Sequence, residues 1–105
     1  MLLPKNILPG PAKMSDYRLR ITDQYRRKER RFLRKHPDLT QQYHKTLVLL
    51  QTSPHHPSLR MHKLKGPLQE FHSVSINIKY RITIEFIIRD KLIIPVTIGS
   101  HDEVY

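Results

Sequence analysis

The sequence predicts an α+β fold: a strand and two helices, followed by a three- to four-stranded antiparallel sheet that packs on the helical hairpin. Two observations support this prediction. In the carboxy-terminal half, apolar residues alternate with other residues along three runs, and a period of two is typical of strands with one buried face. Between residues 23 and 52, apolar residues recur instead at the spacing of amphipathic helices.

Length and composition indicate one compact domain. The chain has 105 residues, of which 38% are hydrophobic, enough for one modest core. We assign residues 16–105 to this domain. Residues 1–15 are expected to form a leader without regular structure, because Pro4, Pro9, Gly10 and Pro11 interrupt helices and strands. Translation from Met14 would remove most of this leader, and the sequence leaves both starts open.

The charge of the chain is strongly one-sided. Lys and Arg number 19 against 9 Asp and Glu, which gives a formal net charge of +10. Such a domain attracts polyanions, so nucleic acid or an acidic protein is the expected partner, ahead of a membrane surface. A purely solubilising basic surface is the alternative. The absence of cysteine excludes disulfides and thiolate metal sites and favours the cytoplasm. No apolar run approaches the ~20 residues that span a bilayer.

The amino-terminal half predicts a strand and the first helix. Residues 17–21 alternate as a half-buried strand does, and Thr22 with Asp23 is a typical helix start. A helix over residues 23–35 places Tyr25 and Phe32 on one stripe. Its other faces carry seven cations, which suit phosphate or carboxylate contact as well as solvent; they are Arg26, Arg27, Lys28, Arg30, Arg31, Arg34 and Lys35.

A second helix should follow Pro37. Asp38 and Gln41 resemble a capping box. Apolar residues then recur at helical spacing, at Leu39, Tyr43, Leu47 and Leu50. The Pro-rich segment 53–57 ends this helix. Adjacent side chains between prolines point apart, so its two histidines do not predict a metal site.

The remaining runs predict the sheet. After a short strand over 60–64, strands are expected over 73–78, 80–88 and 92–98. The turns at 77–79 and 89–91 are short enough for hairpins. Pro95 cannot donate a ladder hydrogen bond, so its strand should lie at an edge, open to a partner chain, or carry a bulge there.

Basic, imidazole and phenol groups gather at the ends and on one face of this sheet. Arg81 points away from the apolar side and should lie near Ser75, while His101 and Tyr105 follow the last strand. If the strand order brings these groups to His62, an arginine could hold a phosphodiester and a histidine could move protons near neutral pH. That set suits metal-free RNA cleavage through the 2′-hydroxyl. Alternatively, each group is an ordinary surface residue, and Arg81 pairs with a carboxylate such as Glu85.

Three segments together resemble the RelE/ParE toxin superfamily, most closely its RelE/StbE and YafQ-like branch. They are His62-Lys63-Leu64-Lys65-Gly66, Tyr80-Arg81-Ile82 and Ile98-Gly99-Ser100-His101-Asp102-Glu103-Val104-Tyr105. The resemblance covers residues 17–105. It implies the toxin of a type II toxin–antitoxin pair, a cytoplasmic endoribonuclease that cleaves mRNA on the ribosome without metal or other cofactor. It also implies a hetero-oligomer with a small acidic antitoxin.

The resemblance also assigns roles to residues. It makes Arg81 the phosphate-stabilising arginine, His101 and His62 the acid–base pair in either order, and Tyr105 the aromatic group on the substrate nucleotide. The basic residues expected to contact mRNA or ribosomal RNA are Arg27, Arg31, Arg60, Lys63 and Lys65.

One departure from the family pattern opens alternatives. Active nucleases of the family commonly have a basic residue where this chain has Ser75, and often one near Ser73, so the chain supplies hydroxyls in their place. A missing cation beside the phosphate weakens transition-state stabilisation. The alternatives are a ParE-like inhibitor of DNA gyrase, or a catalytically weakened relic that binds RNA or an antitoxin.

Overall fold

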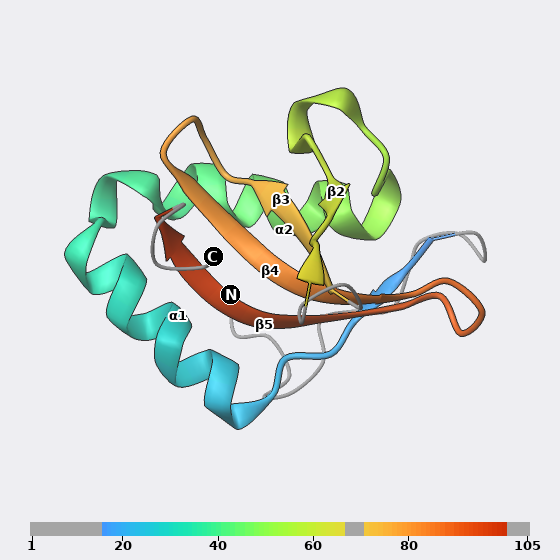
Figure 1. Ribbon diagram of the computed structural model, residues 1–105. Coiled ribbons are helices and arrows are strands. Elements are labelled where there is room, and N and C mark those ends of the chain that lie inside the picture. The colour runs from blue at the N-terminus through green and yellow to red at the C-terminus, as the bar shows by residue number, and fades with distance from the viewer. Residues whose placement is uncertain (1–15, 67–70, 101–105) are drawn as a thin grey trace.

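The computed structural model describes residues 16–66 and 71–100, and these form two α-helices packed on a five-stranded mixed sheet (Figure 1). The strands lie in the order β1-β5-β4-β3-β2. The elements are β1 (Arg18–Leu19), α1 (Asp23–Lys35), the 3-10 helix η1 (Pro37–Leu39), α2 (Thr40–Thr52), the 3-10 helix η2 (Pro57–Leu59), β2 (His62–Lys63), β3 (Phe71–Ser75), β4 (Tyr80–Ile87) and β5 (Leu92–Ser100).

The predicted α+β class is confirmed, but the sheet is wider than expected and is not wholly antiparallel. The two-residue strand β1 pairs in parallel with β5, through Arg18 opposite Leu92 and Leu19 opposite Ile93. The equally short β2 adds an antiparallel edge to β3. Both short strands fall inside expected strands, over residues 17–21 and 60–64, but the parallel pairing joins segments that are distant in sequence, and alternation along a strand does not reveal its partner.

The first helix begins and ends where the sequence predicts. Thr22 is extended, and its hydroxyl accepts a hydrogen bond from the amide of Tyr25 at 3.0 Å. That bond satisfies one of the amides that a helix start leaves without a partner. The side chains of Tyr25 and Phe32 are buried, as the apolar stripe requires.

The start of the second helix was predicted incorrectly. Asp38 lies inside η1, and no side chain caps the amino terminus of α2. Pro37 begins a 3-10 turn, so Asp38 cannot occupy the extended cap position that a capping box needs. The hydroxyl of Thr40 donates to the carbonyl of Pro37 at 2.9 Å instead.

Both hairpin turns are present, and the first one begins earlier than the alternation suggests. The side chain of Asn77 accepts hydrogen bonds from the amides of Lys79 and Tyr80 at 2.9 and 2.8 Å. This turn ends β3 at Ser75. Ile78, which continues the apolar alternation, therefore lies in the turn and is 92% exposed.

Pro95 lies at an irregularity in β5. The register between β4 and β5 shifts at Thr83/Ile84, and Pro95 lies opposite Ile84, which agrees with the expected bulge. The edge here is not open as expected, because Pro95 is fully buried and α1 lies along β5 (Figure 1). Lys28 of that helix donates to the carbonyl of Val96 at 3.2 Å.

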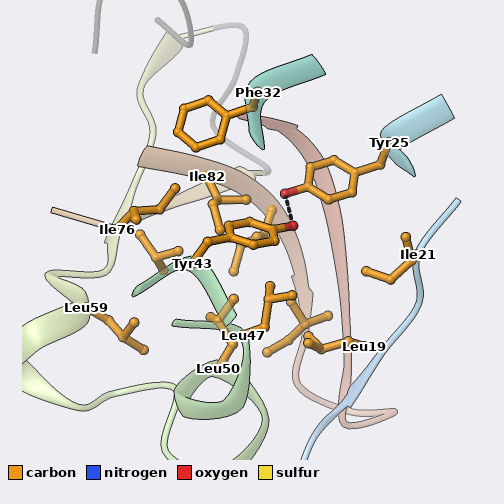
Figure 2. Packing of buried hydrophobic residues seen from close by; sticks show 13 residues of the cluster. Leu19, Ile21, Tyr25, Phe32, Tyr43, Leu47, Leu50, Leu59, Ile76 and Ile82 are labelled. Atoms are coloured by element: carbon orange, nitrogen blue, oxygen red, sulfur yellow. Dashed lines mark hydrogen bonds between the residues drawn. The ribbon is translucent and has the colours of Figure 1, made fainter. Parts of the chain in front are cut away.

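The core lies between the helices and one face of the sheet (Figure 2). Its buried residues are Leu19, Ile21, Tyr25, Phe32, Tyr43, Leu47, Leu50, Leu59, Val74, Ile76, Ile82, Ile84 and Ile93. Within it, the hydroxyls of Tyr25 and Tyr43 lie 2.9 Å apart, and Tyr43 donates to Glu29 at 2.7 Å. Burial raises the pKa of both phenols well above the ordinary range. None of the described helices is long and apolar enough to cross a membrane.

Candidate functional site

Strand parity places a row of polar residues on the face of the sheet opposite the core. Ile82 and Ile84 of β4 are core residues, so Arg81 and Thr83 point to the other face. On β3, Val74 belongs to the core, and parity puts Ser73 on the same side as Arg81. The helices pack on the other face.

Arg81 is the centre of this row. It is 9% exposed. Its Nε donates to the hydroxyl of Ser73 at 2.6 Å, and its Nη2 donates to the carbonyl of Arg60 at 2.9 Å. Nη2 also lies 3.3 Å from the carbonyl of Ser73. Within the described residues Arg81 forms no ion pair, so the alternative pairing with Glu85 is not found there. A buried guanidinium that no described carboxylate pairs with is equipped to bind an anion.

His62 lies directly beside Arg81. Its Nδ1 is 3.3 Å from Nη2 of Arg81 and 3.3 Å from the carbonyl of Arg60. The imidazole tautomer protonated on Nδ1 donates to this carbonyl and carries its lone pair on Nε2. The imidazole is exposed, so it is accessible from solvent. The structure thus brings together two of the predicted catalytic residues, from β2 and β4.

The third member of the arrangement is a backbone group. Arg60 ends η2 in the left-handed conformation, with φ 45° and ψ 47°. This conformation is uncommon for residues other than glycine. The carbonyl of Arg60 lies within hydrogen-bonding distance of both Arg81 and His62. Neither this carbonyl nor Ser73 was among the predicted functional groups. The residue type does not show where a backbone carbonyl points. The alternation that places Ser73 and Arg81 on one face of the sheet could, however, have identified the serine.

The predicted RNA-binding cations fall into two separate groups. Arg60, Lys63 and Lys65 are exposed and belong to the segment that carries His62. Arg27 and Arg31 are exposed on α1, which lies along β5, whereas β2 is the opposite edge of the sheet (Figure 1). The structure therefore does not bring the α1 cations to Arg81.

His101 and Tyr105 lie outside the described residues, so their predicted place beside Arg81 stays a prediction. The last described pairings in β5 set Gly99 opposite Arg81 and Ser100 opposite Tyr80. His101 is thus the second residue after the partner of Arg81 in the sequence.

The two serines of β3 have different roles. Ser75 is the Cα partner of Arg81, as expected, but its hydroxyl donates to the carbonyl of Asn77 at 2.6 Å and secures the hairpin turn. Ser73, two residues earlier, holds the guanidinium. Both hydroxyls are therefore engaged within the protein.

His72 lies on the core side of β3, as parity predicts, opposite Ile84. Burial lowers its pKa, with smaller contributions from the positive charges of Lys63, His55 and His62. The Nδ1 of its ring is buried without a hydrogen-bond partner in the described structure. His72 therefore faces away from Arg81.

The described residues contain no group of three or more His, Asp or Glu side chains that could hold a metal ion. The two adjacent histidines have separate contacts. His56 accepts from the amide of Ser58 at 3.1 Å, and the ring of His55 packs edge-on against Phe86.

Comparison with solved structures identifies the fold. A mutant of the toxin YafQ from E. coli superimposes with a TM-score of 0.70 at 16% identity, covering 85% of this chain and 98% of that chain. YafQ in the E. coli DinJ–YafQ toxin–antitoxin complex gives a TM-score of 0.68 at 16% identity, covering 85% and 97%.

A YoeB/ParE toxin from Agrobacterium tumefaciens gives a TM-score of 0.65 at 13% identity, covering 79% of this chain and 97% of that chain. No protein-family model and no curated protein matches the sequence. The resemblance to the RelE/ParE superfamily is therefore confirmed in the fold, which these toxins share across almost their whole length.

Proposed function

We propose that this chain is the toxin of a type II toxin–antitoxin pair and that it cleaves mRNA on the ribosome. The observation that carries the proposal is the contact between Arg81 and His62, which lie 3.3 Å apart in a sheet with the YafQ fold. A guanidinium that binds phosphate and an imidazole that transfers protons are the two groups that phosphodiester cleavage through a 2′-hydroxyl requires.

In the proposed reaction, a histidine removes the proton from the RNA 2′-hydroxyl, and the resulting oxyanion attacks the adjacent phosphorus. The bond to the 5′-oxygen breaks, and a second acid protonates that oxygen. The products carry a 2′,3′-cyclic phosphate and a 5′-hydroxyl. Arg81 stabilises the negative charge that develops on the phosphate oxygens. His62 and His101 share the acid and base roles, and Tyr105 orients the nucleotide. No step in this scheme draws on a cofactor.

The test is to add purified protein to translating ribosomes and map the mRNA ends. We expect cuts at defined positions within codons, with cyclic phosphate ends, and their loss in the Arg81→Ala, His101→Ala double variant. Lys45→Gln, which removes an exposed cation of α2, serves as the folding and charge control. Absence of cleavage by the wild-type chain, or equal cleavage by the double variant, refutes the endonuclease proposal.

An acidic antitoxin is the proposed partner. One solved structure with this fold is the toxin in a toxin–antitoxin complex. The +10 charge and the exposed arginines of α1 suit an acidic chain that folds on binding. Co-expression with the product of a small neighbouring acidic reading frame should yield a stable hetero-oligomer and relieve growth arrest.

Inhibition of DNA gyrase is the second candidate function, because a YoeB/ParE toxin shares the fold. A gyrase supercoiling assay separates the two activities: the endonuclease proposal expects supercoiling to continue in the presence of the protein. The third reading, a weakened relic, is favoured by Ser75, whose hydroxyl is engaged in the turn. It expects antitoxin binding without growth arrest.

A further inference from the structure

Most of the donors on the guanidinium of Arg81 are already engaged by the protein. An arginine side chain has five N–H groups. The Nε–H is donated to Ser73, and Nη2 faces the carbonyls of Arg60 and Ser73 and the ring of His62. Nη1 forms no hydrogen bond with the described residues. Among the described residues, the contacts of Arg81 therefore involve Nε and Nη2.

The acceptors that hold Arg81 are neutral. Ser73 is fully buried, so water does not compete for its hydroxyl, and Arg60 contributes a carbonyl rather than a carboxylate. A carboxylate in either place would position the guanidinium but also offset its charge. Neutral acceptors fix the orientation and leave the full positive charge for a bound anion.

The backbone at Arg60 is held in an unusual conformation to supply this contact. Its left-handed φ of 45° directs one carbonyl to both Arg81 and His62. Such conformations persist where the surrounding structure imposes them, and they concentrate at functional sites. In this chain the left-handed residue ends η2 and comes two residues before His62.

We propose that Ser73 is a positioning residue: with the Arg60 carbonyl it forms a neutral clamp that orients Arg81 towards the scissile phosphate and links it to His62. The proposal rests on the endonuclease function. It assigns a role to Ser73, near which active nucleases of the family often have a basic residue. Ser73 acts on the reaction only through Arg81. Removing its hydroxyl should therefore have a different effect from removing a residue that touches the substrate.

The structural arm of the test uses NMR on the full ¹⁵N-labelled chain. We expect the Nε–H of Arg81, assigned through Arg81→Lys, to exchange slowly with water, as a buried, hydrogen-bonded group should. Ser73→Ala should shift this signal or accelerate its exchange. Ser75→Ala removes a hydroxyl from the same strand that bonds Asn77 instead, so it should leave the signal unchanged.

Ser73→Cys is the second variant if the alanine variant fails to fold, because it fills the same space with a weak acceptor. It should produce the same loss of protection. Fast exchange of the Nε–H in the wild-type chain, or equal signals in the Ser73 and Ser75 variants, overturns the clamp whether or not the protein cleaves RNA.

The kinetic arm compares single-turnover cleavage of ribosome-bound mRNA. Ser73→Ala should reduce the cleavage rate by about tenfold to a hundredfold, the scale expected when a reacting group is misplaced. Affinity for the ribosome should stay within about threefold. In the Arg81→Ala background, Ser73→Ala should have no further effect. An additional loss there would show that Ser73 acts independently of Arg81 and would overturn the inference.

Failure of the inference and failure of the proposed function are distinguishable. If the wild-type chain cleaves nothing, the endonuclease proposal falls, and the NMR measurement still decides whether the clamp exists. If the wild-type chain cleaves and Ser73→Ala retains the wild-type rate, only the clamp is refuted.

Discussion

Two cationic regions of this molecule differ in almost every physical respect. Arg81 is a single guanidinium, 9% exposed, held by a serine and a backbone carbonyl. The arginine row of α1 comprises four exposed residues, Arg27, Arg30, Arg31 and Arg34, whose guanidinium groups form no hydrogen bond or ion pair with the described part of the chain. A charge fixed by hydrogen bonds can stabilise one geometry, whereas a row of exposed charges generates a field. We therefore expect Arg81 to determine the rate of reaction and the row to determine affinity.

The largest expected effect tests the held charge. Arg81→Ala should lower the mRNA cleavage rate by about a hundredfold to a thousandfold, the scale for loss of one preorganised donor. Arg81→Lys should be nearly as inactive, because an ammonium group cannot reproduce the forked contacts to Ser73 and Arg60. Single-turnover cleavage at saturating ribosomes measures both. Wild-type rates in the lysine variant would show that charge alone suffices.

The second prediction tests the row. Arg27→Gln with Arg31→Gln should weaken binding to a single-stranded RNA and lower the slope of log affinity against log salt by about 0.7 per arginine that contacts a phosphate. The cleavage rate at saturation should change little. Fluorescence anisotropy between about 50 and 300 mM salt measures the slope, with Lys45→Gln on α2 as the matched single-charge control. A slope identical to that of the wild-type chain would remove the row from RNA binding.

The third prediction concerns the hydrogen bonds that join α1, which carries the arginine row, to Tyr43 of α2. Tyr43→Phe removes the hydroxyl that donates to Glu29 and contacts Tyr25, and it should cost about 1–3 kcal/mol of stability. Tyr25→Phe leaves the bond to Glu29 intact and should cost less, about 0.5–1.5 kcal/mol. Urea unfolding followed by circular dichroism gives both values. Equal costs would contradict the arrangement in which Tyr43 is the central member.

The smallest expected effect concerns His72, which lies on the core side of β3, whereas Ser73 lies on the other side. Because the pKa of His72 is lowered in the folded chain, the unfolded chain binds this proton first as pH falls below about 6.5. Stability should therefore decline as pH falls through that value towards the folded pKa. His72→Leu should reduce the difference in Tm between about pH 7.5 and 5.5. The exposed His44→Gln should leave the difference unchanged.

Local signals accounted for the elements that were predicted correctly. Thr22 and the apolar stripe specify α1 within a few residues, and Asn77 specifies a turn through its own side chain. The errors arise where one local signal competes with another. Asp38 has the residue type of a helix cap, but Pro37 next to it begins a 3-10 turn, and the turn decides the geometry.

The candidate site, too, was predictable only where local sequence signals exist. Parity along β4 places Arg81 on the face away from the core, and the motif beginning at His62 suggested its neighbour. The groups that hold Arg81 depend on the pairing of β2 with β3 and on the backbone conformation of Arg60. Alternation along a strand does not reveal its partner, and residue type does not reveal where a carbonyl points, so only the three-dimensional structure shows these contacts.

The parallel contact between β1 and β5 has a consequence for how the protein matures. It joins Leu19 to Ile93, so the sheet closes only after nearly all of the chain has been synthesised. The helices emerge from the ribosome well before the strands that cover their apolar stripes, and a native contact between such distant partners forms slowly. The pairing of β1 is therefore completed late in synthesis, whereas the contacts of Arg81 with Arg60, His62 and Ser73 join segments that are much closer in the sequence.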